Sequence, residues 1–385
     1  MSGTLQASII KDSASATNNL TLDTGGNATV GNTLVMGSSF LRNRIINGDM
    51  RVNQRGYVSG TPLTTTNSYC TDRFNVTCST TGGFSSYQSS TAPTGFTNSL
   101  FFTKTTGASP AVADTNYIYQ AVEGYNMSDL AWGTANAKTV TFSFWVYAGA
   151  TGTFSGSLRN GPATYYSYPF TYTISAANTW TQISVTIAGP TVGTWTSDNT
   201  AGIYVFFDLG SGTNFRGAAG SWSASNYIGA TGATTYPVST TGGTLYITGV
   251  QLEVGSVATP FERRQYGQEL MLCQRYYQQI TGVGNASGFS PIGTGFVSSA
   301  SLALILIPLA TTMRQAPTYS FTGTMSVNTG LVSPNLTSIS TQYTGTGSTG
   351  FIMAGASAGT MTTGGSVVLY TANATTNSFA MSSEL

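Results

Sequence analysis

The fold is decided by residues 243–280, GTLYITGVQLEVGSVATPFERRQYGQELMLCQRYYQQI. In the first half, apolar residues recur mostly at every second position and the alternation slips once, at Gly249; they are Leu245, Ile247, Val250, Leu252 and Val254. A period of two is typical of a half-buried strand, and a glycine at the slip indicates a β-bulge. This half therefore predicts a strand that closes an all-β domain.

The second half predicts a helix. Thr259–Glu262 (TPFE) places Thr at the N-cap, Pro at the first helical position and Glu three residues after the Thr, which is a capping box. Apolar residues then recur with the 3.5-residue period of a coiled-coil seam, at Tyr266, Leu270, Cys273, Tyr277 and Ile280. Two interpretations stay open: a helix packed on its own domain, and a helix shared between subunits.

The composition favours short strands joined by tight turns. The chain has 385 residues, enough for two or three domains, and only 7% of them are charged, against about 25% in an average protein. Hydrophobic residues make up 40% and aromatic residues 12%, which is ample for a core. Thr, Ser, Asn and 46 glycines take the place of charge. Thr suits strands, and the other three suit turns.

Charge and hydropathy exclude several partners. The net charge is +1 and the only lysines are Lys11, Lys104 and Lys138, so we expect no nucleic-acid partner, which would need clustered cations. No stretch reaches about 18 apolar residues, so we expect no membrane insertion. The N-terminus has no charged leader before an apolar core, which predicts no signal peptide. Cys70, Cys78 and Cys273 are expected as free thiols, although a bridge between the first two stays open.

The patterns of apolar, turn and charged residues divide the chain into four segments. Residues 1–40 carry short strands, at Leu5–Ile10, Leu20–Leu22 and Ala28–Met36, but too little apolar material for a core. We expect this segment to be ordered by oligomerisation or by docking on a partner; the alternative is a flexible leader. Residues 259–280 are expected to form a helical joint. Residues 281–385, whose only charges are Arg314 and Glu384, are expected to form a C-terminal β domain with edges hidden in a symmetric oligomer.

Residues 41–258 predict a β-sandwich, or jelly roll. The segment opens with Asn47-Gly48, a hairpin signal between Ile45-Ile46 and Met50–Val52. Strand-like runs separated by turn residues then recur up to Val254, at Ser99–Lys104, Tyr117–Val122, Thr139–Tyr147, Thr153–Leu158, Tyr165–Ile174, Thr181–Ile187, Ile203–Leu209 and Leu245–Val254. No helical pattern separates them, so the fold class is all-β.

Several stretches resemble a known family. LRNRIINGDMRVNQRG, TDRF at Thr71–Phe74, and the stretches Gln120–Val146 and Thr248–Gln278 resemble a domain of tail fibre proteins of marine and cyanobacterial phages. MRQAPT at Met313–Thr318 is similar to a motif in the domain that often follows it. The strand order also resembles a jelly-roll carbohydrate-binding module. The resemblance implies a virion fibre that is an intertwined homotrimer with sugar-binding-type domains, and it supplies no binding residues. In such a fibre we expect residues 1–40 to attach the chain to other tail or capsid proteins of the virion.

Enzymatic motifs are weak in this sequence. Histidine is absent, which removes the commonest general base and makes the G-x-S-x-G match at 355–359 a chance one. The G-x-G-x-x-G match at 345–350 lacks a following helix. Paired carboxylates are the one serious route to hydrolysis, but the acidic residues of the sandwich have no acid/base spacing; they are Asp72, Asp114, Glu123, Asp129, Asp198, Asp208 and Glu253. Asp198 and Asp208 are possible ligands of a structural Ca²⁺, but we expect no cofactor.

Aromatic loops favour glycan binding instead. A sugar ring offers an apolar face and a rim of hydroxyls, which a flat aromatic ring and planar polar groups bind without titrating. The candidate residues are Tyr165, Tyr166, Tyr168, Trp195, Asp198, Asn199, Trp222 and Tyr227. The alternative is that these rings pack under their loops. We therefore expect a non-enzymatic fibre subunit that binds host surface polysaccharide; the alternatives are a capsid-attached decoration fibre and a polysaccharide-degrading tailspike.

Overall fold

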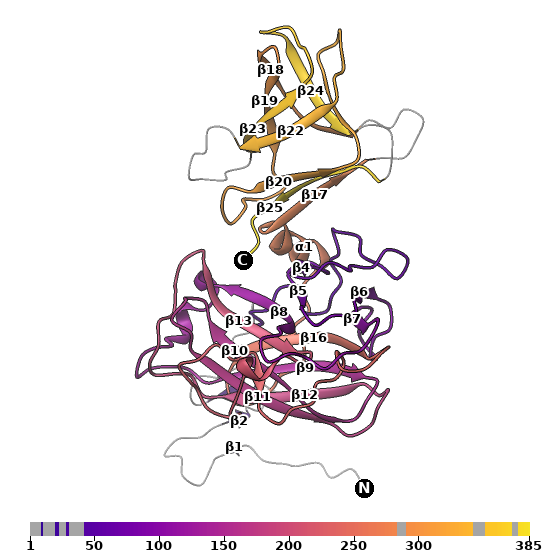
Figure 1. The fold of residues 1–385 in the computed structure, drawn as a ribbon. Helices are drawn as coiled ribbons and strands as arrows, with labels where there is room; N and C mark the ends of the chain where they lie inside the picture. Colours follow the sequence, from indigo (N-terminus) through magenta and orange to yellow (C-terminus); the bar gives the residue numbers. More distant parts are fainter. Residues whose placement is uncertain are drawn as a thin grey trace. The chain divides into compact units, whose positions relative to one another are not determined.

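The computed structural model describes residues 9–10, 20–22, 28–30, 42–282, 290–341, 351–371 and 376–385 (Figure 1). The chain forms two compact units, Met1–Arg42 and Asn43–Leu385. In the first, β1 (Ile9–Ile10), β2 (Leu20–Leu22) and β3 (Ala28–Val30) pair antiparallel in that order. The other residues of the predicted N-terminal strands, and the G-x-G-x-x-G match at 345–350, lie outside the described residues.

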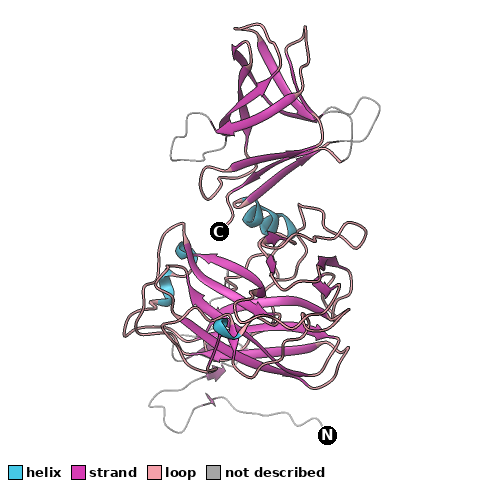
Figure 2. Ribbon diagram, in the orientation of Figure 1, coloured by secondary structure: helices cyan, strands magenta, loops and turns pink. Residues whose placement is uncertain are grey.

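Strands dominate the second unit (Figure 2). Its larger part is a sandwich of two antiparallel sheets, ordered β11-β10-β13-β8-β5-β4 and β12-β9-β16-β7-β6. The strands are β4 (Ser68–Tyr69), β5 (Asn75–Cys78), β6 (Phe84–Ser89), β7 (Ser99–Lys104), β8 (Asn116–Glu123), β9 (Val140–Ala148), β10 (Gly152–Asn160), β11 (Ser167–Ile174), β12 (Thr181–Ile187), β13 (Ala201–Asp208) and β16 (Thr244–Val254). The predicted jelly-roll sandwich is confirmed.

The core lies between the two sheets because each strand sends alternate side chains inward. Phe142 and Phe144 of β9 are fully buried and meet Phe207 of β13 across the sandwich, with ring centroids 5.7 and 5.0 Å apart. The rest is short: the 3₁₀ helices η1 (Gly124–Asn126), η2 (Ser128–Leu130) and η3 (Thr213–Phe215), and the parallel pair β14 (Arg216–Gly217) and β15 (Gly229–Ala230).

The predicted bulge in β16 is confirmed. Along β9 the partners of β16 step from Trp145 to Ser143 while β16 steps from Thr248 to Gln251, so β16 has one extra residue there. Gly249 has φ of +61°, a conformation that glycine adopts without a steric penalty.

The turn at residues 47–50 packs against this bulge. The Val250 N–H donates to the Gly48 carbonyl over 2.9 Å, and a Cβ on Gly48 would lie 2.2 Å from the Val250 carbonyl oxygen. The turn signal of Asn47-Gly48 is thus right, but the predicted flanking strands are absent from residues 45–52. Tertiary contacts with β16 replace the ladder of a hairpin.

The helix α1 is Tyr266–Gln274, so the predicted start after Thr259 is wrong. Its N-cap is Gln265, without a side-chain cap. Both groups of the predicted capping box bind elsewhere: the Thr259 hydroxyl donates to Glu253 over 2.6 Å, and the Glu262 carboxylate accepts from the Asn43 N–H over 2.8 Å.

The predicted helical seam also ends early. Tyr277 and Ile280 belong to strand β17 and not to the helix. The buried face of α1, at Cys273, packs against Ile46 and Val52 of its own chain. Tyr266 and Met271 are exposed.

The C-terminal part is also all-β. One sheet has the order β17-β25-β20 and the other β21-β24-β18-β19-β23-β22. The strands are β17 (Tyr277–Thr281), β18 (Ser290–Ser299), β19 (Leu302–Pro308), β20 (Thr318–Thr322), β21 (Met325–Asn328), β22 (Leu336–Thr341), β23 (Phe351–Ala358), β24 (Ser366–Thr371) and β25 (Ser378–Ser382). Ile305 and Phe379, one from each sheet, are fully buried in a shared core.

Cys70, Cys78 and Cys273 are free and buried. Among the described residues, no helix has the length and apolar character that a membrane span requires.

Candidate functional site

The predicted aromatic loops meet in one cluster, which we call the tryptophan cluster: Trp132, Tyr166, Tyr168, Trp195 and Trp222. The three indoles stand roughly perpendicular to one another, with centroids 4.9 to 5.5 Å apart. The ring of Tyr166 stacks on the Trp222 indole, with an angle of 2° between the two planes and 5.7 Å between the centroids. The ring of Tyr168 is tilted against the same indole, with the centroids 5.4 Å apart. The edge-to-face contacts among the three indoles are an arrangement that aromatic quadrupoles favour.

The indole N–H groups of this cluster are satisfied internally. Trp132 donates to the Lys138 carbonyl over 2.7 Å, Trp222 to the Ala188 carbonyl over 2.8 Å and Trp195 to the Val192 carbonyl over 3.2 Å. Trp195 and Trp222 are half-buried and pack against the sandwich core. The tryptophan cluster therefore holds three loops together, as the packing interpretation of these residues requires.

The remaining predicted residues lie apart from the cluster. Asp198 is exposed and accepts from the N–H and hydroxyl of Thr200, and these hydrogen bonds lower the pKa of its carboxyl. Asn199 exchanges hydrogen bonds with Arg314: its amide donates to the Arg314 carbonyl over 3.1 Å, and its carbonyl accepts from the guanidinium over 2.9 Å. The ring of Tyr227 lies against the Gly217 backbone, where a Cβ would approach it to 2.3 Å.

Tyr165 belongs to a second aromatic surface, which lies on the outer face of the six-stranded sheet. In β13, Ile203, Val205 and Phe207 point into the core, so Tyr204 and Phe206 point outward. The register aligns Phe206 with Tyr119 of β8 and Tyr204 with Arg159 of β10. We call this surface the aromatic face: Tyr69, Tyr117, Tyr119, Arg159, Tyr165, Tyr204 and Phe206.

Arg159 organises one end of the aromatic face. Its guanidinium lies 4.8 Å from the Tyr204 ring centroid and 4.9 Å from those of Tyr165 and Phe206, distances typical of cation–π contacts. It also donates to the side-chain carbonyl of Asn226. Desolvation lowers the pKa of Arg159 from its usual value, opposed by the neighbouring tyrosines. Tyr165 is 40% exposed, so this end presents a ring to solvent.

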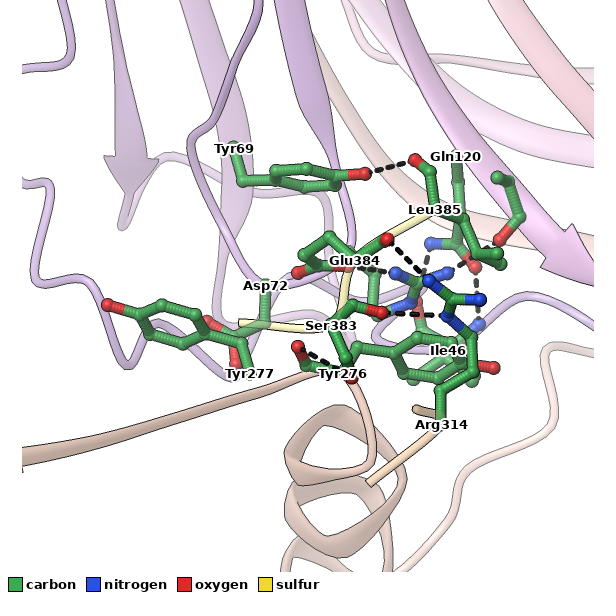
Figure 3. Close-up of polar contacts among 12 residues, drawn as sticks. Ile46, Tyr69, Asp72, Gln120, Tyr276, Tyr277, Arg314, Ser383, Glu384 and Leu385 are labelled. Carbon is green, nitrogen blue, oxygen red and sulfur yellow. Dashed lines mark hydrogen bonds and ion pairs between the residues drawn. The ribbon is translucent and has the colours of Figure 1, made fainter. Parts of the chain in front are cut away.

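The other end of the aromatic face is covered by the C-terminal residues. The Tyr69 hydroxyl donates to the Leu385 carbonyl over 2.6 Å (Figure 3). Burial raises the pKa of Tyr119, beside it, to about 12. The end of the aromatic face that the C-terminal residues leave uncovered is therefore the one formed by Arg159, Tyr165 and Tyr204.

A buried charge network holds the C-terminal residues in place. Arg73, 1% exposed, pairs with Glu384 and lies 3.5 Å from the centroid of the Tyr276 ring. Arg55 pairs with the same carboxylate over 3.1 Å. Arg314 donates to the Ser383 carbonyl over 2.7 Å and to the Glu384 carbonyl over 2.9 Å, as Figure 3 shows.

The acidic residues of the sandwich have structural partners. Asp49 pairs with Arg51 over 2.5 Å. The other seven each accept at least one hydrogen bond from their own chain: Asp72 from Gln54 N, Asp114 from the Thr80 hydroxyl, Glu123 from Arg275, Asp129 from Arg44, Asp198 from Thr200, Asp208 from Arg216 and Glu253 from Thr259. Among the described residues, no group of three or more Cys, Asp or Glu side chains is placed to hold a metal ion.

Sequence reasoning missed Arg159, Tyr204 and Asn226. The available signal was the alternation itself: in Tyr204-Val205-Phe206-Phe207 large apolar residues occupy both faces of one strand. A strand with only one face in the core has no need of aromatic residues on the other, so their presence marks a covered or binding face.

Comparison with known proteins identifies no family. No family model matches the chain, and no curated protein matches it. Solved structures with similarity include the enzymatically active domain of tailspike protein 4 of bacteriophage CBA120, with 13% identity and a TM-score of 0.31 over 56% of this chain and 22% of that one.

Two carbohydrate-binding modules from Clostridium thermocellum are similar over about half of the chain. The C-terminal family 22 module of Xyn10B has 14% identity and a TM-score of 0.28, covering 54% of this chain and 99% of its own. The family 11 module has 10% identity and a TM-score of 0.26, covering 51% and 98%. Because these TM-scores are low, we base the proposal below on geometry.

Proposed function

We propose that this chain is a virion adhesin that binds a host surface glycan at the end of the aromatic face formed by Tyr165, Arg159 and Tyr204. The observation that carries the proposal is the half-exposed Tyr165 ring beside a guanidinium that is itself held between aromatic rings and an amide, Asn226. A ring face binds the apolar face of a sugar, and the planar polar groups bind its hydroxyls.

The carboxylates support binding without hydrolysis. A glycosidase needs two carboxyl groups that face each other across the scissile bond, one of them free to donate a proton. In the sandwich, by contrast, seven carboxylates accept hydrogen bonds from guanidinium, hydroxyl or backbone donors, and the eighth, Asp49, pairs with Arg51 over 2.5 Å. We therefore propose an adhesin in preference to a polysaccharide-degrading tailspike.

The virion context and the trimer rest on the resemblance to phage tail fibres and on the uncharged C-terminal domain. Its only charges, Arg314 and Glu384, are both engaged with the sandwich, through the Asn199 carbonyl and Arg73. A sheet surface without charged residues is prone to association, and a symmetric trimer uses that tendency. A mass measurement in solution tests this part: we expect three chains, and a monomer at all concentrations would contradict the fibre architecture.

The glycan site is tested with two single-tyrosine variants. Tyr165→Ala removes the exposed ring that would contact the sugar face and is expected to weaken binding to host surface polysaccharide by about tenfold, equivalent to about 1.4 kcal/mol. Tyr125→Ala is the control, because Tyr125 is 60% exposed and lies in η1 of the same domain. Equal affinity of the two variants would refute the site.

A further inference from the structure

A cavity of about 780 Å³ lies between the loop of residues 54–69 and the three-stranded sheet of the C-terminal domain. Both sides belong to the compact unit Asn43–Leu385. The Gln54 side chain bridges them by donating to the Tyr277 carbonyl over 2.8 Å, and Arg55 lies 3.6 Å from the centroid of the Tyr277 ring. The volume of the cavity falls in the range of about 300–1,000 Å³ that is usual for small-ligand sites.

One wall of this cavity is a hydroxyl-rich sheet face. In β20, Tyr319 and Phe321 pack toward the C-terminal core, so Ser320 and Thr322 lie on the opposite face. The register aligns Ser320 with Ala380 and, through β25, with Gln279 of β17. Ser320, Thr322 and Thr281 are exposed and line the cavity. This wall offers donors and acceptors in rows.

The opposite wall is aromatic and electrically balanced. Tyr57 and Tyr69 line it as half-buried rings. The charge of Arg55 is neutralised within the protein, by Glu384 at 3.1 Å and Asp72 at 3.7 Å. A ligand of either sign would compete with these ion pairs at a desolvation cost, so the cavity favours an uncharged ligand.

We propose that this cavity is a second glycan subsite, which binds a neutral oligosaccharide between the tyrosine wall and the hydroxyl-rich sheet face. The sheet presents its face here, whereas a peptide that added a strand would need an edge. A neutral sugar chain matches both walls, since its ring faces suit Tyr57 and Tyr69 and its hydroxyls suit Ser320, Thr322 and Gln279. The subsite shares its ligand class with the aromatic face, and Tyr69 belongs to both, but Arg159, Tyr165 and Tyr204 at the uncovered end of that face do not line the cavity.

Cysteine labelling tests the proposal directly. All three native cysteines are buried, so a thiol introduced by Ser320→Cys is the accessible one. The probes are neutral hexasaccharides of glucose, mannose and galactose, and neutral fragments of host surface polysaccharide. At ten times the Kd about one cavity in eleven is free, so at least one probe should slow labelling by a thiol reagent about tenfold. Ser338→Cys, exposed on β22, should show no slowing.

A blocking variant distinguishes this proposal from the proposed function. Ser320→Arg fills the cavity and is expected to remove one of two binding sites per chain, while Ser338→Arg retains both. Tyr165→Ala is expected to remove the other site and leave the protection of Ser320→Cys unchanged. If no probe protects Ser320→Cys, or if Ser320→Arg retains the full stoichiometry, the second subsite is wrong whatever Tyr165→Ala does. Protection in a Tyr165→Ala chain with unaltered glycan affinity would leave the cavity site standing and refute the aromatic-face site.

Discussion

At the scale of single residues, Trp195 separates packing from binding. Its ring contacts two other indoles and the sandwich core, and its N–H is bound by its own loop. We expect Trp195→Ala to lower the free energy of unfolding by about 2–3 kcal/mol, less than the 3–5 kcal/mol of a fully buried ring. Denaturant unfolding measures this. Unchanged stability with lost glycan binding would instead make Trp195 a stacking platform.

The buried tyrosines predict how stability depends on alkaline pH. Burial raises the pKa of Tyr119 and of Tyr277 to about 12, from an ordinary value of 10.0. Between these values the unfolded chain releases protons that the folded chain retains, so the free energy of unfolding falls as pH rises. Phenolate absorbance of the native protein at about pH 11 should therefore correspond to fewer than its 21 tyrosines. Full ionisation with ordinary pKa values in the folded state would contradict this packing.

At the scale of elements, two glycines are expected to respond oppositely to alanine. Gly48 has no room for a Cβ because the Val250 carbonyl oxygen is 2.2 Å from its ideal position, so Gly48→Ala should cost about 2–3 kcal/mol. Gly267 lies in α1, and a Cβ there meets no atom within 4 Å. Gly267→Ala should stabilise the protein by about 0.5–1 kcal/mol. Thermal unfolding compares the two, and a stabilising Gly48→Ala would show that the turn does not dock on the β16 bulge.

Local patterns predicted the strands well and the helix poorly. β7 and β12 have the predicted bounds, because alternation and turn residues are both encoded within a few positions. The capping box failed because Thr259 binds Glu253 at the end of β16, and because Glu262 binds the Asn43 N–H, which lies 219 residues earlier. The seam failed because β17 pairs with β25, about a hundred residues later in the sequence. Such long-range contacts leave no trace in a local period.

The candidate site was predicted in part. Tyr165 is exposed as a binding residue should be, whereas Trp195 and Trp222 pack against the core and Asn199 binds Arg314. Arg159 and Tyr204 come from neighbouring strands whose register aligns them, and register is a property of the assembled sheet. Loop composition alone therefore pointed to Tyr165 and missed the residues beneath it.

At the scale of the whole molecule, Glu384 joins the C-terminal residues to the sandwich. Its carboxylate pairs with Arg73 and Arg55, both largely buried. Glu384→Gln leaves Arg73 without a buried counter-charge and should cost about 3 kcal/mol in the free energy of unfolding. Asp129→Asn is the matched control. Asp129 also pairs with an arginine, Arg44, but its side chain is 56% exposed, so this substitution should lower the free energy of unfolding by less than about 1 kcal/mol. If both substitutions lowered the free energy of unfolding by the same small amount, the buried ion pairs of Glu384 would not stabilise the contact between the C-terminal residues and the sandwich.

The central claim is that this chain binds glycan and does not cleave it. The most direct measurement incubates the intact protein with purified host surface polysaccharide and follows both retention of the polymer and the appearance of new reducing ends. We expect retention that depends on Tyr165, with no new reducing ends during prolonged incubation. Release of oligosaccharide, or the absence of any retention, would contradict the account.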